Sequence, residues 1–125
     1  MDERKELGRA AEKAAFRALK GAGYRILARN RKTRRGELDA VCFEDGQIVF
    51  VEIRARSNSA AGGAIEAFGP RKRRQVVQAA AEYMSEKRIE EDSVRFDVVA
   101  VDASGEAPVC DIVRDAFRPE GRRFA

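Results

Sequence analysis

The segment from Gly36 to Arg56, GELDAVCFEDGQIVFVEIRAR, constrains the fold more than any other part of the chain. Asp45-Gly46 at its middle predicts a two-residue type I′ turn, because both central positions of that turn need a positive φ. A turn at this point joins two strands, residues 36–44 and 47–56, and fixes which residues face each other across them. The segment therefore predicts an antiparallel hairpin with a defined register.

Two acidic residues are expected to face each other across this hairpin. The register places Asp39 opposite Glu52, with Cβ atoms roughly 4.5–5.5 Å apart, and like charges at that spacing destabilise a sheet. A hard divalent cation held by the carboxylate oxygens would relieve the repulsion. The alternative is that both acids are solvated or neutralised by Arg54 and Arg56. The opposite face of the hairpin is wholly apolar, and we expect it to be core: Leu38, Ala40, Cys42, Val49, Val51, Ile53 and Ala55.

These motifs resemble a known family. Gly-Glu-Leu-Asp, an apolar strand and then Val-Phe-Val-Glu-Ile-Arg-Ala-Arg are similar to the YraN-like group of small uncharacterised proteins, which belongs to the restriction-endonuclease-like superfamily. The resemblance implies an α/β fold with a central mixed β-sheet flanked by helices. It also implies that Asp39 and Glu52 are the catalytic acids that bind Mg²⁺ or Mn²⁺, and that Arg54 stands where the superfamily has a lysine. A guanidinium does not lose its proton near neutral pH, so catalysis is left open.

A third acid, Glu12, lies within the apolar arc of a helix expected from Glu3 to Lys20 and closed by Gly21 and Gly23. In the archaeal Holliday-junction resolvases, to which this family is similar, a first-helix glutamate joins the metal site. That similarity implies Glu12 as a catalytic residue and metal ligand. The alternative is that Glu12 pairs with an arginine at the edge of the core or caps the sheet.

Basic residues gather on both sides of the acidic pair. They predict contacts with a polyanion, because three clusters around one carboxylate pair exceed what a small acidic molecule needs. We expect nucleic acid, DNA rather than RNA, as the partner, and a homodimer is left open. A second helix, expected from Arg71 to Lys87, begins in one of these clusters, where its free amides favour phosphate. The predicted nucleic-acid-binding residues are Arg31, Arg34, Arg35, Arg56, Arg71 and Lys72.

Length and composition limit the remaining choices. With 125 residues, 44% of them hydrophobic, we expect one domain over 1–125 that ends in a mobile basic tail at 118–125. The chain has no histidine, which excludes histidine-based catalysis and histidine-ligated zinc. It has no apolar run long enough for a membrane span, so we expect a cytoplasmic protein that does not bind membranes. Further strands are expected at 24–31, 94–102 and 108–113, and a flexible loop at 57–69, of a kind that often moves or closes over a substrate.

The sequence thus supports three functions. The leading one is a metal-dependent endonuclease that hydrolyses phosphodiester bonds. The second is a catalytically inactive nucleic-acid-binding module of the same fold, and the third is a structural partner of an acidic protein. Only metal-dependent cleavage separates the first from the second.

Overall fold

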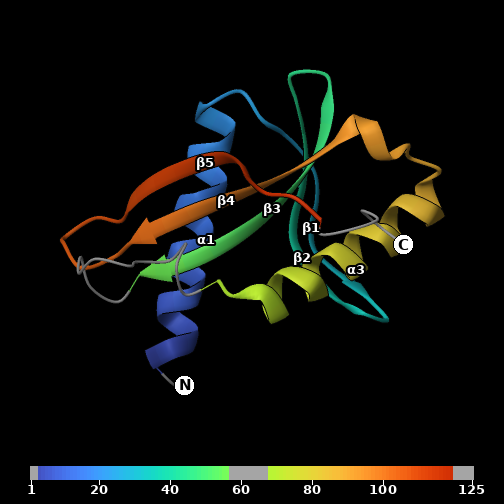
Figure 1. Ribbon diagram of the computed structural model, residues 1–125. Coiled ribbons are helices and arrows are strands. Elements are labelled where there is room, and N and C mark those ends of the chain that lie inside the picture. Colours follow the sequence, from blue (N-terminus) through green and yellow to red (C-terminus); the bar gives the residue numbers. More distant parts are fainter. Residues whose placement is uncertain (1–2, 57–67, 120–125) are drawn as a thin grey trace.

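The computed structural model describes residues 3–56 and 68–119, and it describes the side chains of residues 8–55 and 68–119 (Figure 1). Residues 57–67 of the loop expected at 57–69, the end of the tail at 120–125 and the side chain of Arg56 lie outside these residues. The elements follow in the order α1 (Glu3–Gly21), β1 (Arg25–Thr33), β2 (Gly36–Glu44), β3 (Gln47–Arg56), α3 (Pro70–Lys87), a short 3₁₀ turn (Glu91–Ser93), β4 (Val94–Asp102) and β5 (Val109–Phe117).

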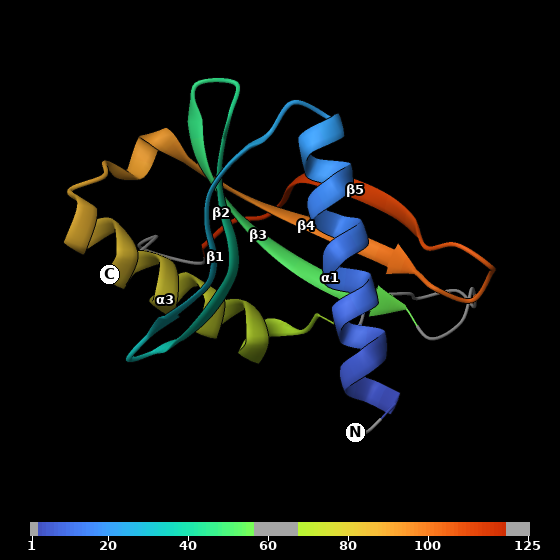
Figure 2. The ribbon, with the colours of Figure 1, turned by 180° about the vertical axis from the view of Figure 1, so that it is seen from behind.

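The five strands form one mixed sheet in the order β1-β2-β3-β4-β5. Only β3 and β4 are parallel, and α3 connects them. Helix α3 covers one face of the sheet, and α1 covers the other, as the views from the two sides show (Figure 1, Figure 2). The fold is therefore α/β with a central mixed sheet flanked by helices, as the restriction-endonuclease-like resemblance implies.

The hairpin forms as predicted. Asp45 and Gly46 have φ values of 54° and 77°, which the type I′ turn requires. Strands β2 and β3 pair from Glu44 opposite Gln47 to Ala40 opposite Val51. The prediction for Leu38 is wrong: Leu38 lies in the cluster beneath α3, not with Ala40 on the α1 face. The period-two alternation therefore breaks between residue 38 and residue 41, next to Asp39.

Each face of the sheet carries its own hydrophobic core. The α1 core contains Ala11, Ala15, Phe16, Leu19, Tyr24, Ala40, Cys42, Val49, Val51, Val99 and Val101. The α3 core contains Leu38, Val41, Phe50, Phe68, Val76, Ala79, Ala80, Tyr83, Met84, Phe96, Val98 and Phe117. The sequence predicts that the buried face of α3 has Lys72, Ala79 and Tyr83 along one edge and consists of Val76, Val77, Ala80, Ala81 and Met84. Val76, Ala80 and Met84 are buried as predicted, but Val77 and Ala81 are only partly buried. Ala79 and Tyr83 are buried in addition, so the helix is rotated toward the edge that carries Lys72.

Strand β5 is longer than predicted and continues from Val113 to Phe117. Its added part supplies a backbone donor, the Asp115 amide, to the fully buried Asp97 carboxylate at 2.9 Å. Phe68 and Arg118, expected in the flexible loop and the tail, are both held in place. Phe68 is buried in the α3 core, and Arg118 pairs with Asp115 at 2.7 Å. Within the described residues, no helix is long and apolar enough to cross a membrane.

Candidate functional site

Asp39 lies where β2 and β3 separate. The two strands are paired as far as Ala40 and Val51, and β3 then continues along β4, with Glu52 opposite Val98. The amide of Ile53, one residue further along β3, donates to Oδ2 of Asp39 at 2.8 Å. The Ile53 amide lies beyond the last β2–β3 pair and needs another acceptor, which the Asp39 side chain supplies. This bond fixes the Asp39 carboxyl beside β3.

Glu52 lies next to Asp39 and is almost fully buried, with 3% of its surface exposed. Burial raises the pKa of the Glu52 carboxyl to about 8, and the charge of Asp39 adds to the shift. Burial also raises the pKa of Asp39. Oε2 of Glu52 is buried and has no hydrogen-bond partner among the described residues. Two carboxyls can bond to each other only through a shared proton, so this pair calls for a proton or a cation.

Lys72 supplies the nearest positive charge. Its Nζ lies 3.7 Å from Oε1 of Glu52. The positive charge of Lys72 lowers the pKa of Glu52 more than the positive charge of Arg54 does. Lys72 reaches the site because it continues the buried stripe of α3 that includes Val76 and Tyr83, at spacings of four and eleven residues. The sequence places Lys72 at the start of this helix among the predicted phosphate contacts, and the helix rotation brings it to the acids.

Arg54 lies near the pair but is held by a different group. Its guanidinium carbon is 5.6 Å from the centroid of the Phe68 ring, a cation–π contact. Within the part of the chain that the structure describes, Arg54 forms no ion pair with Asp39 or Glu52. Arg73 also holds Phe68 in place, because its Nε donates to the carbonyl of Phe68 at 2.9 Å. The alternative in which Arg54 directly neutralises the two acids therefore lacks a contact.

Glu12 is not gathered with the other two acids. Its Oε1 accepts a hydrogen bond from Nδ2 of Asn30 at 2.6 Å. Asn30 lies opposite Asp39 by register, between the pairs Arg29–Ala40 and Arg31–Leu38, and it adopts a left-handed φ of 48°. Among the described residues, no three His, Cys, Asp or Glu side chains form a group that could hold a metal ion. The first-helix acid thus contacts a side chain of β1, the strand that pairs with the one carrying Asp39.

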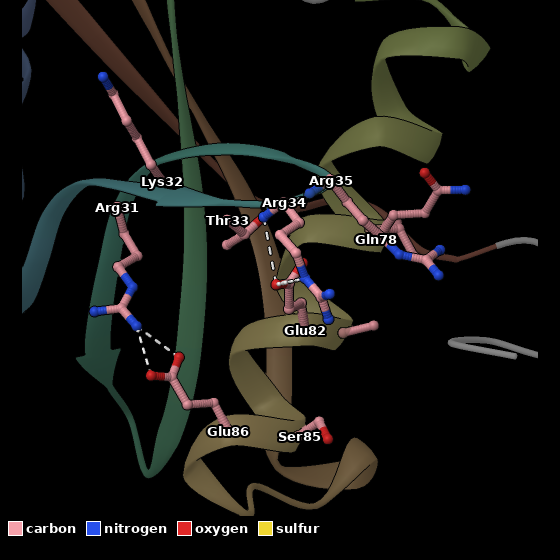
Figure 3. Close-up of a pocket in the computed structure, with 11 residues that line it drawn as sticks. Arg31, Lys32, Thr33, Arg34, Arg35, Gln78, Glu82, Ser85 and Glu86 are labelled. Carbon is pink, nitrogen blue, oxygen red and sulfur yellow. Dashed lines mark hydrogen bonds and ion pairs between the residues drawn. The ribbon is translucent and has the colours of Figure 1, made fainter.

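Five of the six predicted basic residues fall into two places. Arg71 and Lys72 lie in the first turn of α3, and Lys72 contacts Glu52 of the acidic pair. Arg31, Arg34 and Arg35 lie on the β1–β2 tip, residues 31–35, which together with the second half of α3 encloses a groove of about 1180 Å³ (Figure 3). Gly36 crosses α3 near Gln75 and Ala79, so the tip separates the groove from the acids.

Sequence reasoning missed two residues near the site. For Asn30, the residue type could have indicated a left-handed backbone, since asparagine tolerates a left-handed φ better than most residues do. A single asparagine within a strand pattern is not enough to predict that conformation. Phe68 had a weaker signal, because it is one aromatic residue in a run of small ones. Its burial depends on β5, which reaches Phe117 only through residues that the strand pattern did not include.

Comparison with known proteins finds relatives along nearly the whole chain. The model of the "Uncharacterised protein family UPF0102" matches residues 11–101. A UPF0102 protein of Anaeromyxobacter sp. (strain Fw109-5) is 43% identical over 96% of this chain and 90% of that protein. Another, from Ectopseudomonas mendocina (strain ymp), is 42% identical over 94% of this chain and 98% of that protein.

One solved structure is also similar, that of Pyrococcus furiosus SfsA in complex with Ca²⁺. The TM-score is 0.42 and the sequence identity is 15%, and the match covers 89% of this chain and 62% of that one. This chain thus spans less than two thirds of that protein.

Proposed function

Because this chain belongs to the uncharacterised protein family UPF0102, whose name assigns no activity, we propose a function from the geometry of its own residues. The proposal is metal-dependent hydrolysis of phosphodiester bonds in nucleic acid, with DNA as the first substrate to test. One observation carries it. Glu52 is buried beside Asp39 with an oxygen that has no partner among the described residues, and such a pair is costly unless a proton or a cation neutralises it.

The residues present fit Mg²⁺ or Mn²⁺. Mg²⁺ sites that act on phosphates use one or two carboxylates, and water and phosphate oxygens complete the coordination. Asp39 and Glu52 supply two carboxyls, and the unpartnered Oε2 of Glu52 is a ligand atom without another use. Both acids would hold the ion. Glu12 is a third ligand only if it exchanges its contact with Asn30 for the metal.

When bound, the ion would polarise the scissile phosphate and lower the pKa of a coordinated water. The residues of the chain supply the remaining functions. Asp39 holds its position through the Ile53 amide, which fixes the ligand before metal binds. Lys72 offsets negative charge at Glu52 and lies at the start of α3, whose free amides favour a phosphate. Arg54, placed on Phe68, adds a fixed positive charge that stays protonated.

Cleavage of plasmid and branched DNA with Mg²⁺ or Mn²⁺ tests this proposal. We expect the wild-type chain to cut, and Asp39→Asn and Glu52→Gln to lose at least about 100-fold in rate, the scale seen when an electrostatic group is removed from an active site. Glu90→Gln removes an exposed acid and is the matched control. Cleavage that persists in Asp39→Asn, or that is absent with every substrate and metal, contradicts the enzymatic proposal.

The second candidate is a binding module without catalysis, and Arg54 favours it, because an arginine replaces the usual lysine and contacts Phe68. This module would bind DNA equally well with EDTA and with Mg²⁺. Replacing Arg31, Arg34 and Arg35 by glutamine should reduce the log–log salt slope of binding by about 0.9 for each phosphate that these side chains neutralise in the wild type. An unchanged slope means that the β1–β2 tip does not contact the nucleic-acid backbone.

A further inference from the structure

The groove beside the β1–β2 tip contains two ion pairs between arginines and acids of α3. Arg31 donates from one terminal nitrogen to both carboxylate oxygens of Glu86, at 2.7 and 2.6 Å (Figure 3). The backbone amide of Arg34 donates to Oε1 of Glu82 at 3.3 Å, and the Arg34 Nε lies 3.5 Å from the same oxygen. Two arginines that the sequence assigns to phosphate binding are thus occupied by carboxylates of the same chain.

These pairs leave bonding capacity unused on both sides. Nε of Arg31 and Oε2 of Glu82 are buried and have no hydrogen-bond partner among the described residues. The guanidinium of Arg34 is 94% exposed, and the Glu86 side chain is 50% exposed. Exposed ion pairs contribute little net free energy, so the cost of separating these two is small. A phosphate offers a bidentate partner of matching geometry to each guanidinium.

The remaining tip cations are already available. Within the described residues, Lys32 and Arg35 form no ion pair, although both line the groove. Lys32 points away from α3 (Figure 3). The tip therefore carries four cations in five residues, and Glu82 and Glu86 cancel about half of that charge locally.

The groove and the acidic pair lie on opposite sides of the tip along one helix. Lys72 beside Glu52 and Glu82 in the groove are ten residues apart, which is about 15 Å along the axis of α3. A polyanion that crosses the tip can therefore contact the groove and still reach the acids, because several backbone phosphates span that distance.

We propose that Glu82 and Glu86 act as internal substitutes for phosphate: they hold Arg31 and Arg34 in the free protein, and the backbone of nucleic acid displaces them on binding. This inference rests on the nucleic-acid binding in the proposed function. Each arginine exchanges a carboxylate for a phosphate, so the acids lower affinity while they keep the arginines in position. Tyr83 contributes to the positioning, because the Arg31 guanidinium carbon lies 5.8 Å from its ring centroid.

The test is the affinity of a short DNA duplex at fixed salt for wild type and for Glu82→Gln/Glu86→Gln. We expect the double variant to bind tighter by about 2- to 5-fold for each pair removed, the range of exposed ion-pair energies. Glu90→Gln/Glu106→Gln changes the net charge equally, away from the groove, and should bind less tightly than the groove variant. Thermal melts verify that each variant is folded.

A second variant separates competition from a general change in charge. If Glu86 acts by occupying Arg31, Glu86→Gln should strengthen binding in the wild type and have no effect in an Arg31→Gln background. The inference is overturned if the groove variant binds no tighter than wild type or no tighter than its control. If wild type and variants all fail to bind DNA at low salt, the proposed nucleic-acid binding fails, and this inference fails with it.

Discussion

The buried acids Asp97 and Glu52 differ in their hydrogen-bond partners, and this difference distinguishes a structural acid from a candidate functional one. Asp97 is fully buried, but it accepts hydrogen bonds from the Tyr24 hydroxyl at 2.6 Å, from two nitrogens of Arg95 at 2.8 Å and from the Asp115 amide. Glu52 is buried almost as deeply, and its positively charged partner among the described residues is Lys72, at 3.7 Å. Asp97 is satisfied by the chain itself, whereas Glu52 is left for something else to satisfy.

Asp97→Asn should therefore destabilise the fold. The substitution keeps an oxygen for one donor, but it removes the charge that Arg95 faces and leaves part of that guanidinium unsatisfied. We expect a loss of about 3 kcal/mol in the free energy of unfolding, measured by urea denaturation. An unchanged free energy of unfolding would show that the hydrogen bonds of Asp97 do not hold β4 to β5 and to Tyr24, the residue before β1.

Glu44 gives the fold a defined pH dependence. Hydrogen bonds from Arg114 lower the pKa of Glu44 to about 2, against an ordinary value of 4.5, and Arg95 contributes further. A carboxyl whose pKa is lower in the folded state stabilises the fold above its unfolded pKa and loses that contribution as the pH falls. Wild type should thus exceed Glu44→Gln in free energy of unfolding at pH 7, and the difference should shrink as the pH falls from about 4.5 toward 2. A difference that is constant with pH contradicts this assignment.

At the scale of elements, the hairpin is the unit that organises the sheet. Its turn needs a glycine at residue 46, where φ is 77°, and no atom lies close enough to obstruct an added Cβ. A change there acts through backbone conformation alone. Gly46→Ala should cost about 1 kcal/mol in the free energy of unfolding, while Gly46→Asn should cost less, because asparagine tolerates the left-handed region. Equal costs for the two variants would mean that the turn is not the reason for this glycine.

The sequence predicts this hairpin, both helices and β4 because each has a strong local signal: a two-residue turn, an amphipathic period or an apolar run. It fails where a distant element decides. Leu38 leaves its predicted face because β2 separates from β3 at Asp39. The end of β5 carries Arg114 and Asp115, which are polar residues that look like loop. They belong to the strand because Glu44 and Asp97 bind them.

The same limit applies to the candidate site. The proximity of Asp39 and Glu52 follows from the turn at Asp45-Gly46, so the sequence could predict it, although the ladder between β2 and β3 ends one pair earlier, at Ala40 and Val51. The contact of Lys72 with Glu52 depends on how α3 is rotated against the sheet. The periodicity placed Ala79 and Tyr83 only at the edge of the buried face, whereas both are buried. The contact of Glu12 with Asn30 depends on a left-handed residue in β1 that no pattern indicated.

For the whole molecule, the acidic pair, Lys72 and the groove are arranged along α3, with the β1–β2 tip between the acids and the groove. The α1 side of the sheet carries a second hydrophobic core in which the Cys42 thiol has a pKa raised by burial to about 12, so it is unreactive at neutral pH. The groups with unsatisfied bonding capacity among the described residues lie on the α3 side, at Arg31, Glu52 and Glu82. We therefore expect ligands on that side.

Thermal melting of wild type and Asp39→Asn, with and without Mn²⁺, tests the central claim most directly. Asparagine keeps an oxygen for the Ile53 amide and removes one of the two like charges, so the metal-free variant should be as stable as wild type or more stable. Mn²⁺ at about 100 times its dissociation constant should stabilise wild type by about 2.7 kcal/mol and leave the variant unchanged. If wild type shows no metal-dependent shift and Asp39→Asn melts at a lower temperature, the two acids are structural and the metal site is contradicted.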